Sequence, residues 1–396
     1  METNINHPAY CVTGGMVLNL TTSHAAVSAM LHTRTDYIFT NLVIPLIMTV
    51  GILGNAAFIF AVSRVKSMQT IINAYLVNMA VADIIFVSSS VITLYGYHTS
   101  PVAQDTFFTS WVGCTLAWGL PNMLFFASLL SVTFVTVERY CAICSPLRHR
   151  AVAGKKHTAR LLIITWIGGV LYGVCVTPDF GQLLSYCVLW PETEEYATFP
   201  STIEYCVPFP SQVGNIFAQV VQITPFVLAM FGNLFMYYRI LQELSTRPDA
   251  NVGGGNASTD PAAAEDPNTA AKTKFQIIRN QVARLLITNG VIFFVCQAPF
   301  RLINLQVILL YTVGEGLFTA SQFNILIPVG RTMIMVNACI NVFVYLTTSS
   351  YYRKGFARAF GCSRVWNWSS LMDSKITTSG GGIVQGGSSV NAQSRL

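Results

Sequence analysis

Charged residues are scarce in this chain of 396 residues. Lys, Arg, Asp and Glu make up 10% of the sequence and hydrophobic residues 53%, whereas soluble domains carry about 25% charged residues. So few charges cannot cover a water-facing surface of ordinary size. The composition therefore excludes an ordinary soluble globular protein and indicates a chain that lies mostly in a membrane.

Several stretches lack charge altogether, and residues 37–63, 106–137 and 205–238 are the longest of them. Each exceeds the roughly 20 helical residues that cross a hydrocarbon core about 30 Å thick. Lipid offers no hydrogen-bond partner to the backbone, so we expect helices. The sequence thus predicts an all-α membrane protein, a seven-transmembrane helix bundle. The seven spans are expected near 38–63, 71–96, 109–144, 159–180, 213–241, 276–311 and 320–346.

The chain divides into four predicted regions. Residues 247–271 and 373–396 are rich in small and polar residues that cannot form a packed core. After the last span, Tyr352, Phe356 and Phe360 recur every four residues among basic side chains, which predicts a short amphipathic eighth helix on the membrane surface. The expected regions are an extracellular tail 1–36, the bundle 37–346 with a flexible cytosolic loop 245–272, the amphipathic helix 347–362 and a disordered cytosolic tail 363–396.

Basic residues concentrate on one side of the predicted spans, and on the opposite side only Arg34 is found. The positive-inside rule therefore places the N-terminus outside the cell and the C-terminus in the cytosol, as expected for a multi-pass protein of the plasma membrane. In this orientation Asn19, in an Asn-Leu-Thr sequon, is a predicted glycosylation site. Cys362, after the amphipathic helix, is a predicted palmitoylation site, although a free thiol is the alternative.

Cysteines on the predicted outer side number four, namely Cys11, Cys114, Cys187 and Cys206. Disulfides persist outside the cell. Cys114 opens the third span and can pair with either Cys187 or Cys206 of the long loop between spans 4 and 5. We favour Cys206, because this choice leaves enough loop to reach back across the bundle. Cys11 and Cys187 can then form a second bridge.

Polar residues within the spans are costly and usually face the interior of a bundle. Asp83 lies in the middle of its span, and Ser128, Asn337 and Asn341 lie in other spans. Oxygen-rich groups around one carboxylate suit a small hard cation such as Na⁺, or ordered water. The alternative is a hydrogen-bonded polar core that only fixes the helix packing.

Each predicted span also carries a motif at a characteristic place. In chain order these are Gly54-Asn55, Leu76 to Asp83, Cys114 with Glu138-Arg139-Tyr140, Trp166, Pro225, Phe293 with Cys296 and Pro299, and Asn341 with Tyr345. This set resembles rhodopsin-like (class A) G protein-coupled receptors over residues 37–362. The resemblance implies a non-enzymatic receptor that activates a heterotrimeric G protein and also binds arrestin. No Lys occurs between Lys274 and Lys354, so a retinal Schiff base in span 7, and hence an opsin, is excluded.

The resemblance implies an activation region at the cytosolic membrane edge. Glu138 can hold Arg139 in a resting ion pair, because the long Arg side chain can fold back to its neighbour. Once released, Arg139 turns toward the G protein and Tyr345. The alternative is that the two charges only end the helix at the interface. The residues assigned to coupling are Glu138, Arg139, Tyr140, Pro146, Leu147, Asn341 and Tyr345.

Three positions depart from the family pattern. Family members usually have Trp where this chain has Gln297, Pro where it has Val342, and often Tyr where it has Asn233. These positions belong to the movements of spans 5, 6 and 7 during activation. We still expect an active receptor, because Arg139 and Tyr345 remain.

The outer half of the bundle contains two isolated cations, Arg301 and Arg331. Amine receptors place an Asp on span 3, where this chain offers Pro121 and Asn122, so an amine ligand is not expected. A desolvated Arg can bind a carboxylate or amide carbonyls, although internal pairing or snorkelling is the alternative. The predicted ligand-binding residues are Asn122, Phe125, Phe126, Gln297, Arg301, Asn304, Arg331 and Met335.

Acidic residues in the long loop between spans 4 and 5, such as Glu192 and Glu204, would receive the basic part of a peptide. We therefore predict a neuropeptide receptor resembling the thyrotropin-releasing-hormone, neuromedin and FMRFamide receptor group. One alternative is a receptor for an acidic lipid or small metabolite. A secondary transporter is disfavoured because no internal repeat is evident. The ending Ser394-Arg395-Leu396 suits a PDZ protein, the lipid bilayer is a further partner, and no nucleic-acid partner is expected.

Overall fold

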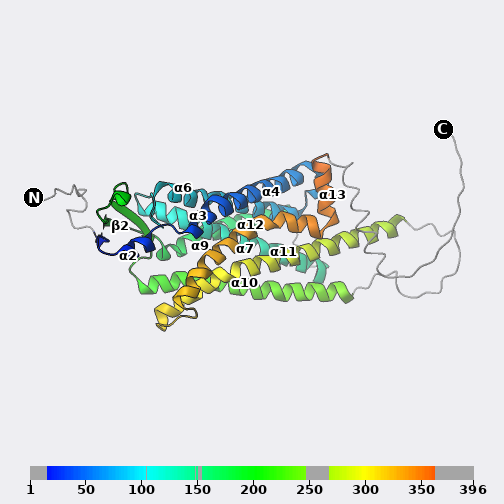
Figure 1. The fold of residues 1–396 in the computed structure, drawn as a ribbon. Helices are drawn as coiled ribbons and strands as arrows, with labels where there is room; N and C mark the ends of the chain where they lie inside the picture. The colour runs from blue at the N-terminus through cyan, green and yellow to red at the C-terminus, as the bar shows by residue number, and fades with distance from the viewer. Residues whose placement is uncertain (1–15, 104, 148, 150–153, 247–266, 362–396) are drawn as a thin grey trace, which may run out of the picture.

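Seven long helical segments run side by side in the computed structural model, which describes residues 16–103, 105–147, 149, 154–246 and 267–361 (Figure 1). Each segment is long and apolar enough to cross a membrane. The predicted seven-helix bundle is therefore confirmed. The segments are Arg34–Arg64, Ile71–Thr99, Trp111–Cys144, Lys155–Asp179, Gln212–Ser245, Asn280–Thr312 and Ile325–Thr348.

Irregular turns interrupt several of these segments. The first consists of α3 (Arg34–Ile38), a π-helical turn η1 (Phe39–Val43) and α4 (Ile44–Arg64), and the second of α5 (Ile71–Ser89) and α6 (Val91–Thr99). Prolines lie inside four helices, where each removes a backbone donor. The remaining helices are α7 (Trp111–Cys144, with Pro121), α9 (Lys155–Cys175, followed by the 3-10 turn η3, Thr177–Asp179), α10 (Gln212–Thr246, with Pro225), α11 (Pro267–Thr312, with Pro299) and α12 (Ala320–Thr348, with Pro328).

Apolar side chains lie on both the inside and the outside of the bundle. The core contains fully buried Phe58, Leu129 and Phe293. The outer surface also carries large hydrophobic residues, including Leu116 and Leu228, which are 63% and 68% exposed. An apolar exterior of this kind is covered by lipid chains rather than by water.

A short helix, α13 (Ser350–Ala359), crosses one end of the bundle (Figure 1). Tyr352 and Phe356 are buried, and their rings lie 6.2 and 6.4 Å from that of Phe58. Phe360, at the end of the helix, is half-exposed and lies 5.3 Å from Phe60. Helix α13 therefore occupies the place predicted for the amphipathic eighth helix.

A small sheet lies at the other end of the bundle (Figure 1). Strands β2 (Gln182–Leu189) and β3 (Thr202–Val207) form an antiparallel hairpin, and β1 (Met16–Asn19) pairs with β2 in parallel. Helix α2 (His24–Met30) follows β1 and buries Val27. The sequence analysis treated this amino-terminal segment only as a tail, because short strands that lack a clear alternation of polar and apolar residues give little signal.

Candidate functional site

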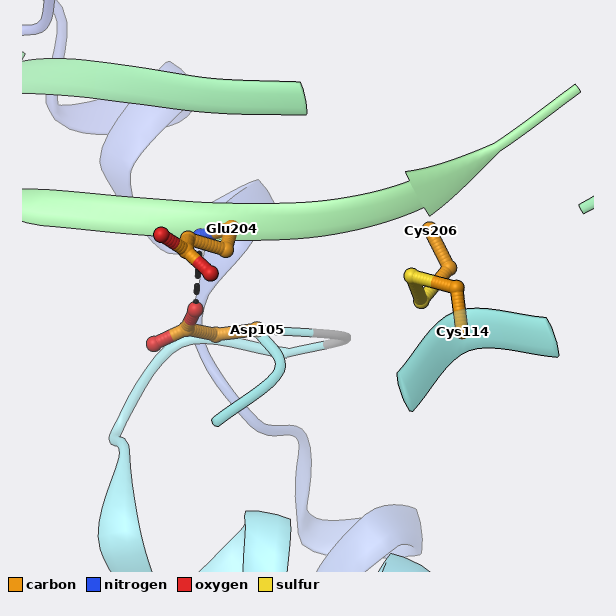
Figure 2. The surroundings of a disulfide bond; sticks show 4 residues. All are labelled: Asp105, Cys114, Glu204 and Cys206. Atoms are coloured by element: carbon orange, nitrogen blue, oxygen red, sulfur yellow. Dashed lines mark hydrogen bonds between the residues drawn. A yellow bond between two sulfur atoms is a disulfide. The ribbon is translucent and has the colours of Figure 1, made fainter. Parts of the chain in front are cut away.

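The disulfide Cys114–Cys206 joins the first turn of α7 to strand β3, as Figure 2 shows. The two Cα atoms lie 5.5 Å apart, within the usual range for a disulfide. The favoured pairing of Cys114 is thus confirmed. Cys187, in β2, is also disulfide-bonded, whereas Cys11 lies outside the described residues.

Two carboxylates lie beside this bridge (Figure 2). Asp105 Oδ1 accepts a hydrogen bond of 2.9 Å from the backbone N–H of Glu204, and the backbone N–H of Thr106 donates to the Glu204 carbonyl oxygen at 2.8 Å. Burial raises the pKa of the Glu204 carboxyl; a hydrogen bond from Ser185 opposes this shift, and the Asp105 carboxylate adds to it. These bonds attach the segment before α7 to the hairpin and place acidic groups there.

Arg301 is a buried cation with neutral partners. Its Nη1 donates to the backbone carbonyl of Gln222 at 3.2 Å, and its Cζ lies 3.9 Å from the centre of the Phe125 ring. The Tyr172 hydroxyl lies beside the guanidinium but not in hydrogen-bonding geometry. Only 6% of Arg301 is exposed, and its Nε has no hydrogen-bond partner. Within the described residues, this guanidinium has no carboxylate partner.

Next to Arg301, three side-chain amides form a hydrogen-bonded network that ends at the carboxylate of Asp179. Asn304 Nδ2 donates to Gln219 Oε1 at 2.6 Å and to Gln222 Oε1 at 2.9 Å. The two glutamines donate in turn to the carboxylate of Asp179 in η3, at 2.6 and 3.4 Å. Of these residues, Arg301 and Asn304 were predicted from the sequence, whereas Gln219, Gln222 and Asp179 were not. Two amides three residues apart in an uncharged span were the available signal for Gln219 and Gln222.

Arg331 lies in different surroundings from Arg301. Its side chain is exposed, its Cζ lies 5.6 Å from the Trp118 ring, and the Asp36 carboxylate is close enough to interact electrostatically. Asn122 uses its Nδ2 to donate to the Trp118 carbonyl oxygen at 2.9 Å. Met335, one turn from Arg331 on α12, is buried.

The predicted ligand-binding residues therefore form more than one group. Phe126 stacks on Tyr172 of α9 with ring centres 4.5 Å apart, and it also approaches Gly168 of that helix. Phe125, one residue earlier, contacts Arg301 and also lies near Tyr172, with ring centres 6.0 Å apart. The structure brings together Phe125, Arg301 and Asn304, and it places Asn122 and Arg331 around Trp118.

A small cavity lies between Asp83 and Gln297. Its volume is about 20 Å³, and Ser128 and Asn337 also line it. Asn341 Nδ2 donates to Asp83 Oδ2 at 2.7 Å. A cavity of this size holds one water molecule or small ion. Of the predicted cation-binding residues, Asp83, Ser128 and Asn337 thus line one cavity, and Asn341 bonds to the carboxylate.

The residues assigned to coupling lie at the α13 end of the bundle. Glu138 is buried, and its Oε1 lies 3.7 Å from His149 Nε2, which makes an ion pair when His149 is protonated. Arg139 interacts electrostatically with the Tyr352 hydroxyl of α13. Tyr345 is buried with its ring centre 5.5 Å from that of Tyr352. The remaining members of this set are Asn341, described above, half-buried Tyr140, and exposed Pro146 and Leu147.

Helices α7, α10 and α11 meet around a tyrosine that the sequence analysis did not identify. Asn233 Nδ2 donates to Thr133 Oγ1 at 3.1 Å, and one turn further Thr136 Oγ1 bonds to the Tyr237 hydroxyl at 3.2 Å. This hydroxyl occupies the space beside Gly290 of α11 where a Cβ would lie. Tyr237 of α10 therefore contacts both α7 and α11, and its hydroxyl fits against α11 because residue 290 is Gly.

Replacing Gly290 with Ala should destabilise the receptor by about 1–3 kcal/mol, because the added methyl group overlaps the Tyr237 hydroxyl. Thermal unfolding of Gly290→Ala, Tyr237→Leu and the double variant measures the coupling between them. The double variant should lose less stability than the sum of the losses in the two single variants. Gly232→Ala is the matched control, since nothing lies within 4 Å of its Cβ position; strictly additive effects would contradict the contact.

Comparison with known proteins assigns the architecture to a family. The family model described as 7 transmembrane receptor (rhodopsin family) matches residues 54–345. No group of three or more His, Cys, Asp or Glu side chains suited to a metal ion occurs among the described residues.

The similar proteins include receptors named for neuromedin U, thyrotropin-releasing hormone and C-C chemokines. Neuromedin-U receptor 2 of Rattus norvegicus is 24% identical over 81% of this chain and 75% of its own length. The thyrotropin-releasing hormone receptor of Gallus gallus is 26% identical over 82% of this chain and 79% of its own length. C-C chemokine receptor type 7 of Homo sapiens is 26% identical over 84% of this chain and 79% of its own length.

Proposed function

Since the chain belongs to the rhodopsin family of seven-transmembrane receptors, we propose that it binds an extracellular neuropeptide and activates a heterotrimeric G protein. The chain is a multi-pass membrane receptor and not an enzyme. The names of its relatives, the neuromedin-U and thyrotropin-releasing hormone receptors, support a peptide ligand. The structural observation that carries the proposal is Arg301, a buried guanidinium whose partners are a backbone carbonyl and an aromatic ring.

The charges at the sheet end suit a peptide that enters with its carbonyl groups first. A guanidinium binds peptide carbonyl or carboxylate oxygens through several donors, and Arg331 is exposed for such contacts. Asp105 and Glu204 lie on the hairpin side and can receive the basic part of the ligand.

The proposed orientation places the sheet outside the cell and α13 in the cytosol. Disulfides form in oxidising compartments, and the bridge Cys114–Cys206 lies at the sheet end. The opposite end carries Lys155 and Lys156, the basic residues at the start of α9. There, exposed Pro146 and Leu147 can contact the G protein.

A sodium ion in the Asp83 cavity is the proposed allosteric ligand. Asp83, Ser128, Asn337 and Asn341 supply oxygen atoms, which hard cations prefer, and the cavity of about 20 Å³ fits one ion. When bound, the ion would neutralise the buried carboxylate and hold α5, α7 and α12 together.

Glycosylation of Asn19 is also proposed. Exposed Asn19 accepts hydrogen bonds through its Oδ1 from Thr21, which leaves its nitrogen available for a glycan. Arrestin and a PDZ protein are proposed cytosolic partners. Cys362 and the terminal Ser394-Arg395-Leu396 lie outside the described residues.

Replacing Arg331 with Ala should raise the peptide concentration needed for half-maximal signalling by about 10- to 100-fold, because a charge-assisted hydrogen bond contributes about 1.5–3 kcal/mol. Calcium and cyclic AMP responses to a neuropeptide library provide the agonist and the measurement. Arg34→Ala, an exposed Arg at the start of α3, is the control. Unchanged potency at equal surface expression would remove Arg331 from the site, and responses only to acidic lipids or metabolites would refute the peptide proposal.

A further inference from the structure

Gln297 lies where the Asp83 cavity adjoins the surroundings of Arg301. Its side chain is 3% exposed and lines the cavity together with Asp83, Ser128 and Phe125. The same Phe125 ring packs against the guanidinium of Arg301. Gln297 therefore occupies the boundary between the proposed ion site and the proposed ligand site.

The amide of Gln297 lacks a complete set of hydrogen bonds. Its Oε1 is buried and has no hydrogen-bond partner. A buried carbonyl oxygen without a partner is destabilising, so such atoms usually bind water or an ion. The polar space available to this amide is the cavity of about 20 Å³ that it shares with the Asp83 carboxylate.

We propose that Gln297 is an additional oxygen ligand of the monovalent cation beside Asp83. The inference rests on the ion site proposed above and adds a residue from α11 to it. The amide oxygen is neutral, so one carboxylate and one monovalent cation leave no net charge at this buried site. A divalent ion would leave a buried positive charge, which is costly in a low-dielectric interior.

A Gln at position 297 offers hydrogen-bonding groups that the usual Trp does not. The indole of Trp, the usual residue here in the family, offers only an N–H donor, whereas Gln offers both a carbonyl oxygen and an NH₂ group. A half-turn of the amide exchanges its oxygen and nitrogen without moving the rest of the side chain. Gln297 can therefore direct its oxygen into the cavity, which an indole cannot do.

The test uses the purified full-length receptor without any agonist. Thermal unfolding is followed while NaCl replaces choline chloride at constant ionic strength, since a ligand of the folded state raises the unfolding temperature as its concentration increases. The wild type should be stabilised by sodium with a measurable midpoint concentration. Gln297→Leu should shift this midpoint upward by about two- to tenfold, the effect of one lost hydrogen-bonding group. Asp83→Asn should abolish the sodium effect.

Gln306→Leu provides the matched control. Gln306 is another buried glutamine of α11, and it bonds to the backbone of Phe318 rather than to the cavity. This variant should lower the unfolding temperature but leave the sodium midpoint unchanged. Gln297→Met, which keeps the length of the side chain, serves if the Leu variant does not fold.

Three results would overturn the proposal: a wild type that does not respond to sodium, a Gln297 variant with the wild-type midpoint, or an equal shift in the Gln306 control. Because no agonist is present, failure of the peptide proposal would leave these measurements unaffected. Conversely, a peptide response that depends on Arg331 would stand even if Gln297 had no effect on sodium binding.

Discussion

Replacing Cys206 with Ala should lower the free energy of unfolding by about 2–5 kcal/mol, the usual cost of removing a native disulfide. The bond joins residues separated by 92 positions, so it restricts a long loop in the unfolded chain. It also holds β3 against the start of α7, close to the Asp105–Glu204 contact. Thermal unfolding of the purified receptor and surface expression in intact cells measure the loss.

Replacing the second cysteine of the disulfide provides an independent test. Cys114→Ala should cost about as much as Cys206→Ala, and the double variant should cost little more than either, because all three remove one bond. Cys175→Ala is the control, since Cys175 is a free and exposed cysteine at the end of α9. If Cys206→Ala were as stable as this control, the bridge would contribute nothing to the fold.

Replacing Arg139 with Ala should abolish ligand-induced G protein activation while ligand binding persists. Arg139 is half-buried near the end of α7 that lies toward α13, and its positive charge interacts with Tyr352 of α13. A cation held at this edge can form charge-assisted hydrogen bonds with backbone carbonyls of a docked partner, and Ala cannot replace them. Ligand-stimulated nucleotide exchange on purified G protein is the direct measurement.

Arg64 provides the comparison for this experiment. It is an exposed Arg in the last turn of α4, and its Cζ lies 5.9 Å from the Phe60 ring. Arg64→Ala should retain most of the nucleotide exchange, because its charge lies on the outside of the bundle. Full exchange by Arg139→Ala would show that this residue only completes the packing of the helix end.

The membrane spans could be predicted closely because their signal is local. Span 3 was expected at 109–144 and is Trp111–Cys144; the first span begins at Arg34 rather than 38. The earlier start depends on a capping box in which Thr33 and Asp36 bond to each other's backbone. Hydropathy reports burial in lipid over many residues, but it does not locate a cap.

The arrangement of the candidate site was harder to predict because it depends on which way each helix faces. Phe125 and Phe126 were assigned to one pocket, yet adjacent residues on a helix point in directions about 100° apart. Both rings lie against Tyr172, but of the two it is Phe125 whose ring faces the guanidinium of Arg301. The contacts of Asp179 with Gln219 and Gln222 join residues 40 and 43 positions apart, and no local pattern reveals such a pairing.

The sheet and the disulfide have a mechanical consequence for the end of α7 that lies beside the sheet. Strand β1 pairs with β2, β2 pairs with β3, and β3 is covalently bonded to α7 through Cys206. The amino-terminal strand and the hairpin are thus linked in series to one helix. If α7 tilts at this end, the strands must move with it. The resistance of α7 to tilting therefore depends in part on residues near the amino terminus.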